Sequence, residues 1–297
     1  MKTFLTRLVS GLVGAALVIS GILYSKYTYF AIIMVALIGA VHEFYGISTD
    51  ARHPEGKLAP KYRRIGLIIA TIAGLLSFLL NQRYVLADIG IVLPVCLFIF
   101  FVIELFTASE NPFRNIAWNV TSLVYIVIPI MLLNKLYFDK GALFVLSLLF
   151  MIWFYDSMCY ISGSLFGKHK LLERVSPGKT VEGLVGGMLL SLTFIFFYDK
   201  ILTYIGTTFE IQVTNYSNIE WVIIGVVTLM AATFGDLVES LLKRSVGVKD
   251  SGTIMPGHGG FLDRLDAILV AIPFAVFTIW MVDQIQNLML VVNYLKS

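Results

Sequence analysis

The stretch IEWVIIGVVTLMAATFGDLV, residues 219–238, decides the fold class of this chain. Almost only apolar and small residues lie between Glu220 near its start and Asp236 near its end. A helix rises about 1.5 Å per residue, so roughly 20 such residues cross the hydrocarbon core of a bilayer. The stretch therefore predicts a transmembrane helix with a carboxylate close to one end.

The composition of the whole chain agrees with that prediction. Of its 297 residues, 58% are hydrophobic and only 14% are charged, and the mean hydropathy is +0.85. Soluble domains carry about 25% charged residues, so this chain lacks the polar surface to face water on all sides. We predict an all-α, polytopic integral membrane protein.

Hydropathy windows of about 19 residues give nine candidate spans. They lie at 6–24, 27–45, 64–81, 85–106, 116–134, 142–164, 183–204, 219–238 and 262–283. With a cytoplasmic N-terminus, 16 of the 22 Lys and Arg residues fall on inside segments, as the positive-inside rule requires. We therefore predict about nine transmembrane helices, with the N-terminus cytoplasmic and the C-terminus outside.

The connections divide the chain into two parts. Residues 1–140 are expected to embed and scaffold, and 141–297 to form a transmembrane catalytic domain with cytoplasmic loops 165–182 and 239–261. The inside connection 46–63 ends in a basic cluster, which we interpret as a topology determinant at anionic headgroups. Cys96 and Cys159 lie in apolar runs and predict small buried hydrophobes rather than a disulfide or a zinc site.

Polar side chains gather where the 219–238 span ends. Asp236, Glu239 and Ser240 stand at i, i+3 and i+4, so they share one helical face, and Lys243 and Arg244 follow. A carboxylate in an apolar helix is costly unless it is paired, hydrated or metal-bound. Taken alone, these residues fit either a binding site or acids neutralised by the two bases at the interface.

The next segment, KDSGTIMPGHGGFLDRLD at 249–266, leads into the last span. Its glycines and proline predict a structured loop. The N-terminus of the following helix offers N–H groups and a positive dipole end that suit phosphate, and Gly259 and Gly260 would let a ligand approach the backbone. Asp263 and Asp266 stand at i and i+3 and share a face.

Acids and bases are dense between these two spans. They are Asp236, Glu239, Asp250, Asp263, Asp266, Lys243, Arg244, Lys249 and Arg264. Carboxylate oxygens select Mg²⁺ or a similar ion, which takes further ligands from substrate phosphates, and the bases can hold phosphate oxygens. We favour such a site over helix capping. His258 could position a phosphate, assist proton transfer or hydrogen-bond within the loop, and it lacks a second histidine at zinc-ligand spacing.

A third polar stretch begins inside the 142–164 span. Asp156 is an ionisable group within a membrane helix, which is a functional hypothesis by default, and it shares a face with Tyr160 and Gly163. The loop that follows contains Gly178-Lys179-Thr180. A phosphate-binding P-loop is rejected, because the earlier glycine at the required spacing and a preceding strand are absent. We expect a basic loop that contacts an anionic headgroup or a nucleotide.

These residues together resemble the phosphatidate cytidylyltransferase (CDP-diacylglycerol synthase) family. The likeness runs in register through Ser240, Lys243-Arg244, Lys249-Asp250, Gly252, Pro256, His258-Gly259-Gly260, Asp263-Arg264 and Asp266, and a second block covers 156–183. Two positions depart from the family pattern. Met255 stands where the family usually has Leu, Ile or Phe, and Gly178 stands where relatives commonly carry a lysine beside Lys179, which bears on how much this loop contributes to anion binding.

The resemblance implies that phosphatidic acid attacks the α-phosphorus of CTP, giving CDP-diacylglycerol and pyrophosphate in phospholipid biosynthesis. It implies Mg²⁺, with a second cation left open, on Asp236 and Asp263 with Asp266 and Glu239 in support. The catalytic residues it implies are Asp263, Asp236, Asp266, Lys249 and His258. The substrate-binding residues are Lys243, Arg244, Arg264, Asp250, Ser240, Lys179 and Asp156.

The expected partners are CTP, phosphatidic acid and membrane lipids, without nucleic acid; a homodimer is left open. The expected location is the cytoplasmic (inner) cell membrane, with the active site on the cytoplasmic face, where a lipid headgroup and soluble CTP can meet. One alternative is a CTP-dependent polyprenol kinase, which would transfer the γ-phosphoryl group instead. A secondary transporter is disfavoured, because such proteins often show paired repeats with broken helices near the midplane, whereas nine spans do not halve.

Overall fold

The computed structural model describes residues 2–49, 58, 60–79, 85–107, 109–209, 211, 216–252 and 259–296. The helices are α1 (Lys2–Tyr24), α2 (Lys26–Thr49), α3 (Pro60–Leu79), α4 (Val85–Thr107), α5 (Pro112–Ser122), the π-helix η2 (Leu123–Val127), α6 (Ile128–Lys140), α7 (Ala142–Phe166), α8 (Val181–Ile195), α9 (Tyr198–Phe209), α10 (Asn218–Ser245) and α11 (Leu262–Lys296). Strands β1 (Lys170–Leu172) and β2 (Ser176–Thr180) pair antiparallel. The sequence did not predict this hairpin.

Each of the nine predicted spans falls on a helix or on consecutive helices. Among the described residues, six segments are long and apolar enough to cross a membrane: Lys26–Ser48, Lys61–Leu79, Pro112–Lys140, Ala142–Phe166, Asn218–Val246 and Leu262–Leu295. The predicted span 183–204 is bent by 46° between α8 and α9 and makes a seventh if it is counted as one span. The structure thus confirms a polytopic helical protein with six or seven candidate spans, and the number nine stays a prediction.

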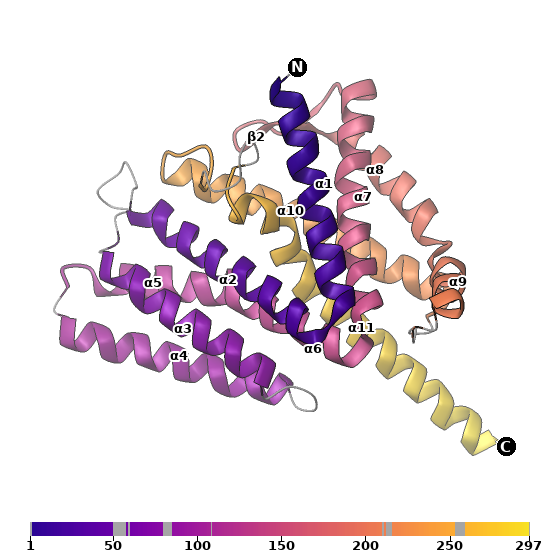
Figure 1. The fold of residues 1–297 in the computed structure, drawn as a ribbon, viewed down its shortest axis with the longest axis horizontal. Helices are drawn as coiled ribbons and strands as arrows, with labels where there is room; N and C mark the ends of the chain where they lie inside the picture. The colour runs from indigo at the N-terminus through magenta and orange to yellow at the C-terminus, as the bar shows by residue number, and fades with distance from the viewer. Residues whose placement is uncertain are drawn as a thin grey trace.

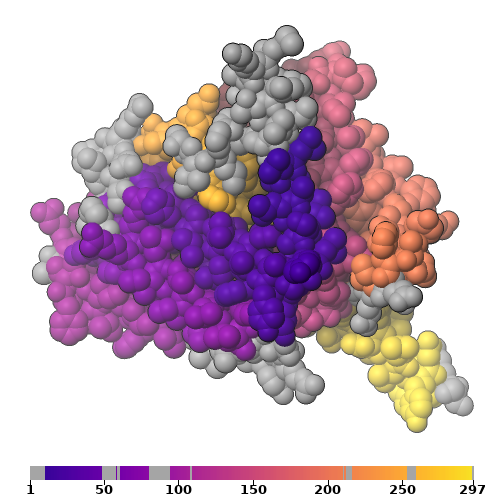
Figure 2. Space-filling view, in the orientation of Figure 1, coloured from indigo at the N-terminus to yellow at the C-terminus, as the bar shows by residue number. Residues whose placement is uncertain are grey.

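The C-terminal helices lie at the centre of the arrangement (Figure 1). Helices α10 and α11 pack along each other, α7 packs on α8, and α11 also contacts α2 and α6. In the view of Figure 1, α2–α5 lie on one side of the α10–α11 pair and α7–α9 on the other. The space-filling view shows the first third of the chain over the left and centre of the near face and later helices at the right, with the end of α11 projecting beyond them (Figure 2).

The segment from α5 to α6 is one continuous span with a π-helical turn in its middle. The N–H of Ile128 donates to the carbonyl of Leu123, five residues back. Pro129 follows and has no N–H, so the Tyr125 carbonyl loses its usual helical donor, and the backbone widens at this point. Such π-bulges are frequent near functional sites, and this one lies beside α11.

Glycines allow α7 and α8 to approach closely. A Cβ added at Gly187 would lie 2.8 Å from the backbone nitrogen of Cys159, and one at Gly183 would lie 2.9 Å from the Cys159 carbonyl oxygen. Small residues at such a crossing replace side-chain contact by backbone contact, a common device between membrane helices. Both cysteines are free; Cys96 is buried as predicted, whereas Cys159 is only half-buried.

We expect Gly187→Val to separate α7 from α8, because the added methyl groups would overlap backbone atoms that cannot move aside. Overpacking of this kind costs about 1–3 kcal/mol. Thermal unfolding of the detergent-solubilised protein, followed by circular dichroism, should show a lower midpoint. Gly14→Val is the matched control, because a Cβ at Gly14 meets nothing within 4 Å; equal midpoints for the two variants would contradict this packing.

Candidate active site

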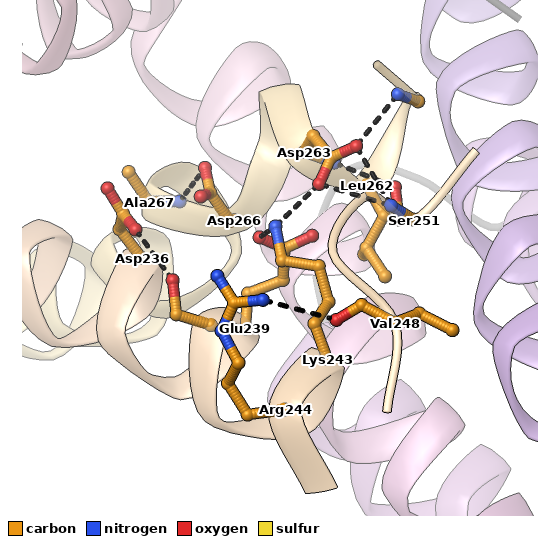
Figure 3. A network of polar contacts seen from close by, with 12 residues as sticks. Asp236, Glu239, Lys243, Arg244, Val248, Ser251, Leu262, Asp263, Asp266 and Ala267 are labelled. Carbon is orange, nitrogen blue, oxygen red and sulfur yellow. Dashed lines mark hydrogen bonds and ion pairs between the residues drawn. The ribbon is translucent and has the colours of Figure 1, made fainter. Parts of the chain in front are cut away.

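The polar ends of α10 and α11 lie side by side. A Cβ at Gly235 would lie 2.5 Å from the carbonyl oxygen of Asp266, so the two backbones nearly touch there. The close approach brings the acids that follow Gly235 on α10 together with those on the first turns of α11, as predicted. Asp236, Glu239, Asp263 and Asp266 all belong to this one region (Figure 3).

Asp263 is held by a lysine and by the backbone of its own loop. Its Oδ1 accepts from the Lys243 Nζ at 2.6 Å, and its Oδ2 accepts from the N–H groups of Gly260 at 2.8 Å and Ser251 at 3.0 Å. Gly259, just before, has φ +76°, a left-handed conformation that glycine adopts without steric cost. The glycines of the loop thus serve to wrap backbone donors around one carboxylate.

Lys243 joins the two helices electrostatically. Its Nζ lies 2.6 Å from Glu239 Oε2 and 2.6 Å from Asp263 Oδ1, and the three side chains are between 1% and 12% exposed. One buried cation therefore serves two buried carboxylates. The other oxygen of Glu239, Oε1, is buried and has no hydrogen-bond partner among the described residues, so the cluster contains one carboxylate oxygen that the lysine does not satisfy.

A second lysine reaches the cluster from the hairpin. Lys179 on β2 places its Nζ 2.6 Å from Asp236 Oδ2, and Ser240 donates to Asp236 Oδ1 at 3.3 Å. The hairpin is fastened to α8 by Glu182, whose carboxylate accepts from the N–H groups of Lys168 and His169. The Gly178–Thr180 segment lies within strand β2 rather than after it, so the structure agrees that it is no P-loop.

A cavity of about 640 Å³ opens beside this second ion pair. Its wall includes Asp156, Lys179 and Asp236 together with apolar side chains such as Ile161 and Leu184. Helices α7, α8, α10 and α11 and the hairpin all contribute to it. The cavity therefore combines an apolar wall with a charged patch, which suits a molecule that is part lipid and part phosphate.

Comparison with known proteins gives the family of the chain. Residues 5–282 match the cytidylyltransferase family. The chain belongs to that family.

Curated relatives named phosphatidate cytidylyltransferase are similar over part of their length. The chain is 37% identical to the Haemophilus influenzae protein over 172 residues, which are 56% of this chain and 57% of that one. It is 36% identical to a Staphylococcus aureus protein over 183 residues (59% and 64%), and 34% identical to the Thermotoga maritima protein over 169 residues (56% and 61%). The chain thus spans about three-fifths of the length of the curated relatives it matches.

Not every predicted site residue joins the cluster. Arg244 is exposed and donates to the Val248 carbonyl at 3.5 Å, and Lys249 and Asp250 are exposed on the loop after α10. Arg264 is exposed on α11 and lies within electrostatic range of Asp156. His258 lies outside the described residues, so its predicted role stays a prediction.

Two further residues meet this region without having been predicted. Glu43 on α2 contacts Ser251 and the start of α11. Tyr125 on η2 has a buried hydroxyl without a partner in the described ranges, within electrostatic range of Asp266, Glu239 and Asp236. An acid inside a predicted span was a signal for Glu43, as it was for Asp156. For Tyr125 the hydropathy pattern offered no signal.

The fit of Mg²⁺, which the family resemblance implies, can be tested on the donor set. Among the described residues, no three acidic, histidine or cysteine side chains lie close enough to hold one ion, and Lys243 stands between Glu239 and Asp263. Mg²⁺ usually takes one or two carboxylates and completes its shell with waters and substrate phosphates. The unpartnered Glu239 Oε1 is one carboxylate oxygen without a hydrogen-bond donor in the described ranges, and a magnesium ion shared with substrate stays a prediction. The predicted set of four carboxylate ligands stays a prediction.

We expect Lys243→Met to lower stability strongly, because it leaves Glu239 buried without its cation. Removing one partner of a buried pair costs about 3–5 kcal/mol. The unfolding midpoint in detergent should fall well below that of Lys249→Met, which makes the same change at an exposed lysine. Adding Glu239→Leu to Lys243→Met should recover part of the loss, and equal midpoints for the two single variants would contradict the buried pair.

Proposed function

We propose that this chain is a membrane-embedded phosphatidate cytidylyltransferase, which converts CTP and phosphatidic acid to CDP-diacylglycerol and pyrophosphate. The observation that carries the proposal is two lysines held by carboxylates: Lys179, paired with Asp236 in the cavity wall, and Lys243, buried between Glu239 and Asp263. They occur in a chain whose family match runs through residues 5–282. The similarity to proteins named phosphatidate cytidylyltransferase suggests the specific reaction.

The proposed reaction does not need a strong general base. An oxygen of the phosphatidic acid phosphate forms a bond to the α-phosphorus of CTP, and the bond from that phosphorus to the bridging oxygen of the β-phosphate breaks. The electron pair leaves with pyrophosphate. The nucleophile is already anionic, so the obstacle is to bring two anions together and to stabilise the charge that develops on the leaving group.

Lys179 and Lys243 suit that electrostatic problem. Each ammonium is held by a carboxylate at 2.6 Å, so its position is set before any substrate arrives. Cations that are fixed in advance need little reorganisation during the reaction, which is the main source of electrostatic catalysis. Mg²⁺ bound by carboxylates from the set Asp236, Glu239, Asp263 and Asp266 would add charge neutralisation on the triphosphate.

The cavity offers a place for the lipid substrate. Its wall on α7 and α8 carries apolar side chains such as Ile161 and Leu184, and Asp156 on α7 and Lys179 on β2 line the same cavity. The glycerol and the first part of the acyl chains would lie against the apolar wall, with the phosphate toward Lys179. A CTP-dependent polyprenol kinase could use the same features, so the product distinguishes the two functions.

We also propose the predicted topology: nine spans, an N-terminus inside, a C-terminus outside and an active site on the cytoplasmic face of the cell membrane. Its support is a contact between the predicted inside loop 165–182 and the end of the 219–238 span, which leads into the other predicted inside loop, 239–261. Lys179 belongs to 165–182 and touches Asp236, which lies three residues before 239–261 begins. A loop on one side of a bilayer could not touch the end of a span that lies on the opposite side.

Purified protein given CTP, phosphatidic acid and Mg²⁺ should form CDP-diacylglycerol and pyrophosphate in equal amounts, measured by mass spectrometry and a pyrophosphate assay. Chelation of Mg²⁺ should stop the reaction. Asp263→Asn should lower turnover at least roughly a hundredfold, because misplacement of charged groups near the reacting atoms has effects of this size.

Asp139→Asn is the matched control, since Asp139 pairs only with a neighbouring lysine in the same helix, Lys135, in the interactions described. It should keep full activity. Release of CDP together with a phosphorylated alcohol would identify the kinase instead, and near-normal turnover of Asp263→Asn would remove the proposed role of that carboxylate.

The topology predicts which exposed positions a membrane-impermeant thiol reagent reaches in intact cells. Thr207→Cys, on the predicted outside connection, should be labelled. Lys170→Cys, on the hairpin, should be labelled only after the membrane is permeabilised. Both side chains are exposed, so access to the reagent depends on the side of the membrane, and the reverse pattern would show the opposite orientation.

A further inference from the structure

The start of α11 rests on a carboxylate from the N-terminal part of the chain. Glu43 on α2 is 4% exposed. Its Oε2 accepts hydrogen bonds from Ser251 Oγ at 3.1 Å and from the backbone N–H of Leu262 at 2.9 Å. These partners are 208 and 219 residues away in the sequence. The contact joins the two parts into which the sequence divides at residue 140.

This carboxylate caps a helix to which it does not belong. Leu262 is the first residue of α11, so its N–H is one of those that the helix itself cannot satisfy. A carboxylate is also favoured there by the positive end of the helix dipole. The acceptor that fixes the N-terminus of α11 thus comes from α2.

Ser251 connects Glu43 to the acid cluster by hydrogen bonds (Figure 3). Its Oγ, which donates to Glu43, accepts from the N–H of Asp263 at 3.3 Å, and its own N–H donates to Asp263 Oδ2 at 3.0 Å. Asp263 in turn holds Lys243. A continuous chain of hydrogen bonds therefore runs from Glu43 to the lysine between the two helices.

The loop is shaped to admit this side chain. A Cβ added at Gly252 or at Gly260 would collide with the carboxylate of Glu43. One turn earlier on α2, a Cβ at Gly39 would lie 2.6 Å from the ring of Phe261, so α2 also packs closely on the loop. The sequence suggested that Gly260 makes room for a ligand; in the structure it makes room for a carboxylate of the protein itself.

We infer that Glu43 is a positioning residue for the site between α10 and α11. It holds Ser251 and the first residue of α11, and through them Asp263 and Lys243, in the arrangement that the transfer requires. The inference rests on the proposed function for its kinetic consequence. It gives residues 1–140 a part in the reaction beyond embedding and scaffolding.

The test compares Glu43→Gln with Glu104→Gln. Glu104 is the matched control: it is 6% exposed on α4 and accepts from Ser109 Oγ at 2.6 Å, away from the α10–α11 cluster. Glu43→Gln keeps the shape but weakens a charge-assisted acceptor. We expect its kcat to fall roughly tenfold to a hundredfold, because small displacements of reacting groups have effects of this order. KM for CTP should change by less than about threefold, since the binding groups remain.

Amide hydrogen exchange supplies a readout that does not depend on activity. In Glu43→Gln, peptides that cover 249–252 and 259–265 should exchange roughly tenfold faster, as expected for a hydrogen bond to a charged group that is weakened. In Glu104→Gln the same peptides should exchange at the wild-type rate. The kcat of this variant should stay within about twofold of the wild-type value.

The inference is overturned if exchange of these peptides is unchanged in Glu43→Gln, whatever its turnover. It is also overturned if Glu104→Gln lowers kcat and accelerates exchange of the same peptides to the same extent. If the wild-type protein forms no CDP-lipid at all, the proposed function fails, and the exchange comparison still decides whether Glu43 holds the loop.

Discussion

The contact on which the site depends is the buried ammonium of Lys243 between Glu239 and Asp263. Without it, two carboxylates from different helices would repel each other in a region of low polarity, where unpaired charge is costly. With it, α10 and α11 are held together at their polar ends, and the close approach at Gly235 becomes possible. The same lysine is one of the two cations to which the proposed reaction assigns a role. Stability and proposed catalysis therefore draw on one set of charges.

The hairpin and α2 each contribute a charged side chain to the region around the α10–α11 pair. From one side, Lys179 brings a second cation to Asp236 and forms part of the cavity wall. From the other, Glu43 secures the loop that presents Asp263. Neither residue lies in the two helices that carry most of the acids. The site is thus assembled by side chains from distant parts of the sequence, and helix positions throughout the protein bear on its geometry.

Local patterns in the sequence were enough to predict the features that depend on helical spacing. The apolar run that ends at Asp236, and the i, i+3 spacing of Asp263 and Asp266, led correctly to acids that meet where two membrane helices adjoin. Three structural features could not be predicted from local sequence patterns. The hairpin is too short and too polar to show strand periodicity, the bend between α8 and α9 occurs inside an apolar run, and the contact of Glu43 joins residues more than 200 positions apart. Long-range pairing of this kind is set by tertiary packing, for which a single sequence holds no periodic signal.

The sequence separation of Glu43 from its partners has a consequence for biogenesis. During synthesis, α2 leaves the ribosome long before Ser251 and Leu262 exist, 208 and 219 residues later. Until α11 is made, the carboxylate of Glu43 lacks the Ser251 and Leu262 donors. Burying it in lipid without them would be costly. It therefore has to remain in contact with water at the membrane surface, or be neutral, while the helices from α3 to α10 are made. The contact that joins α2 to the start of α11 can form only after the last helix has been made, so it belongs to the final stage of assembly.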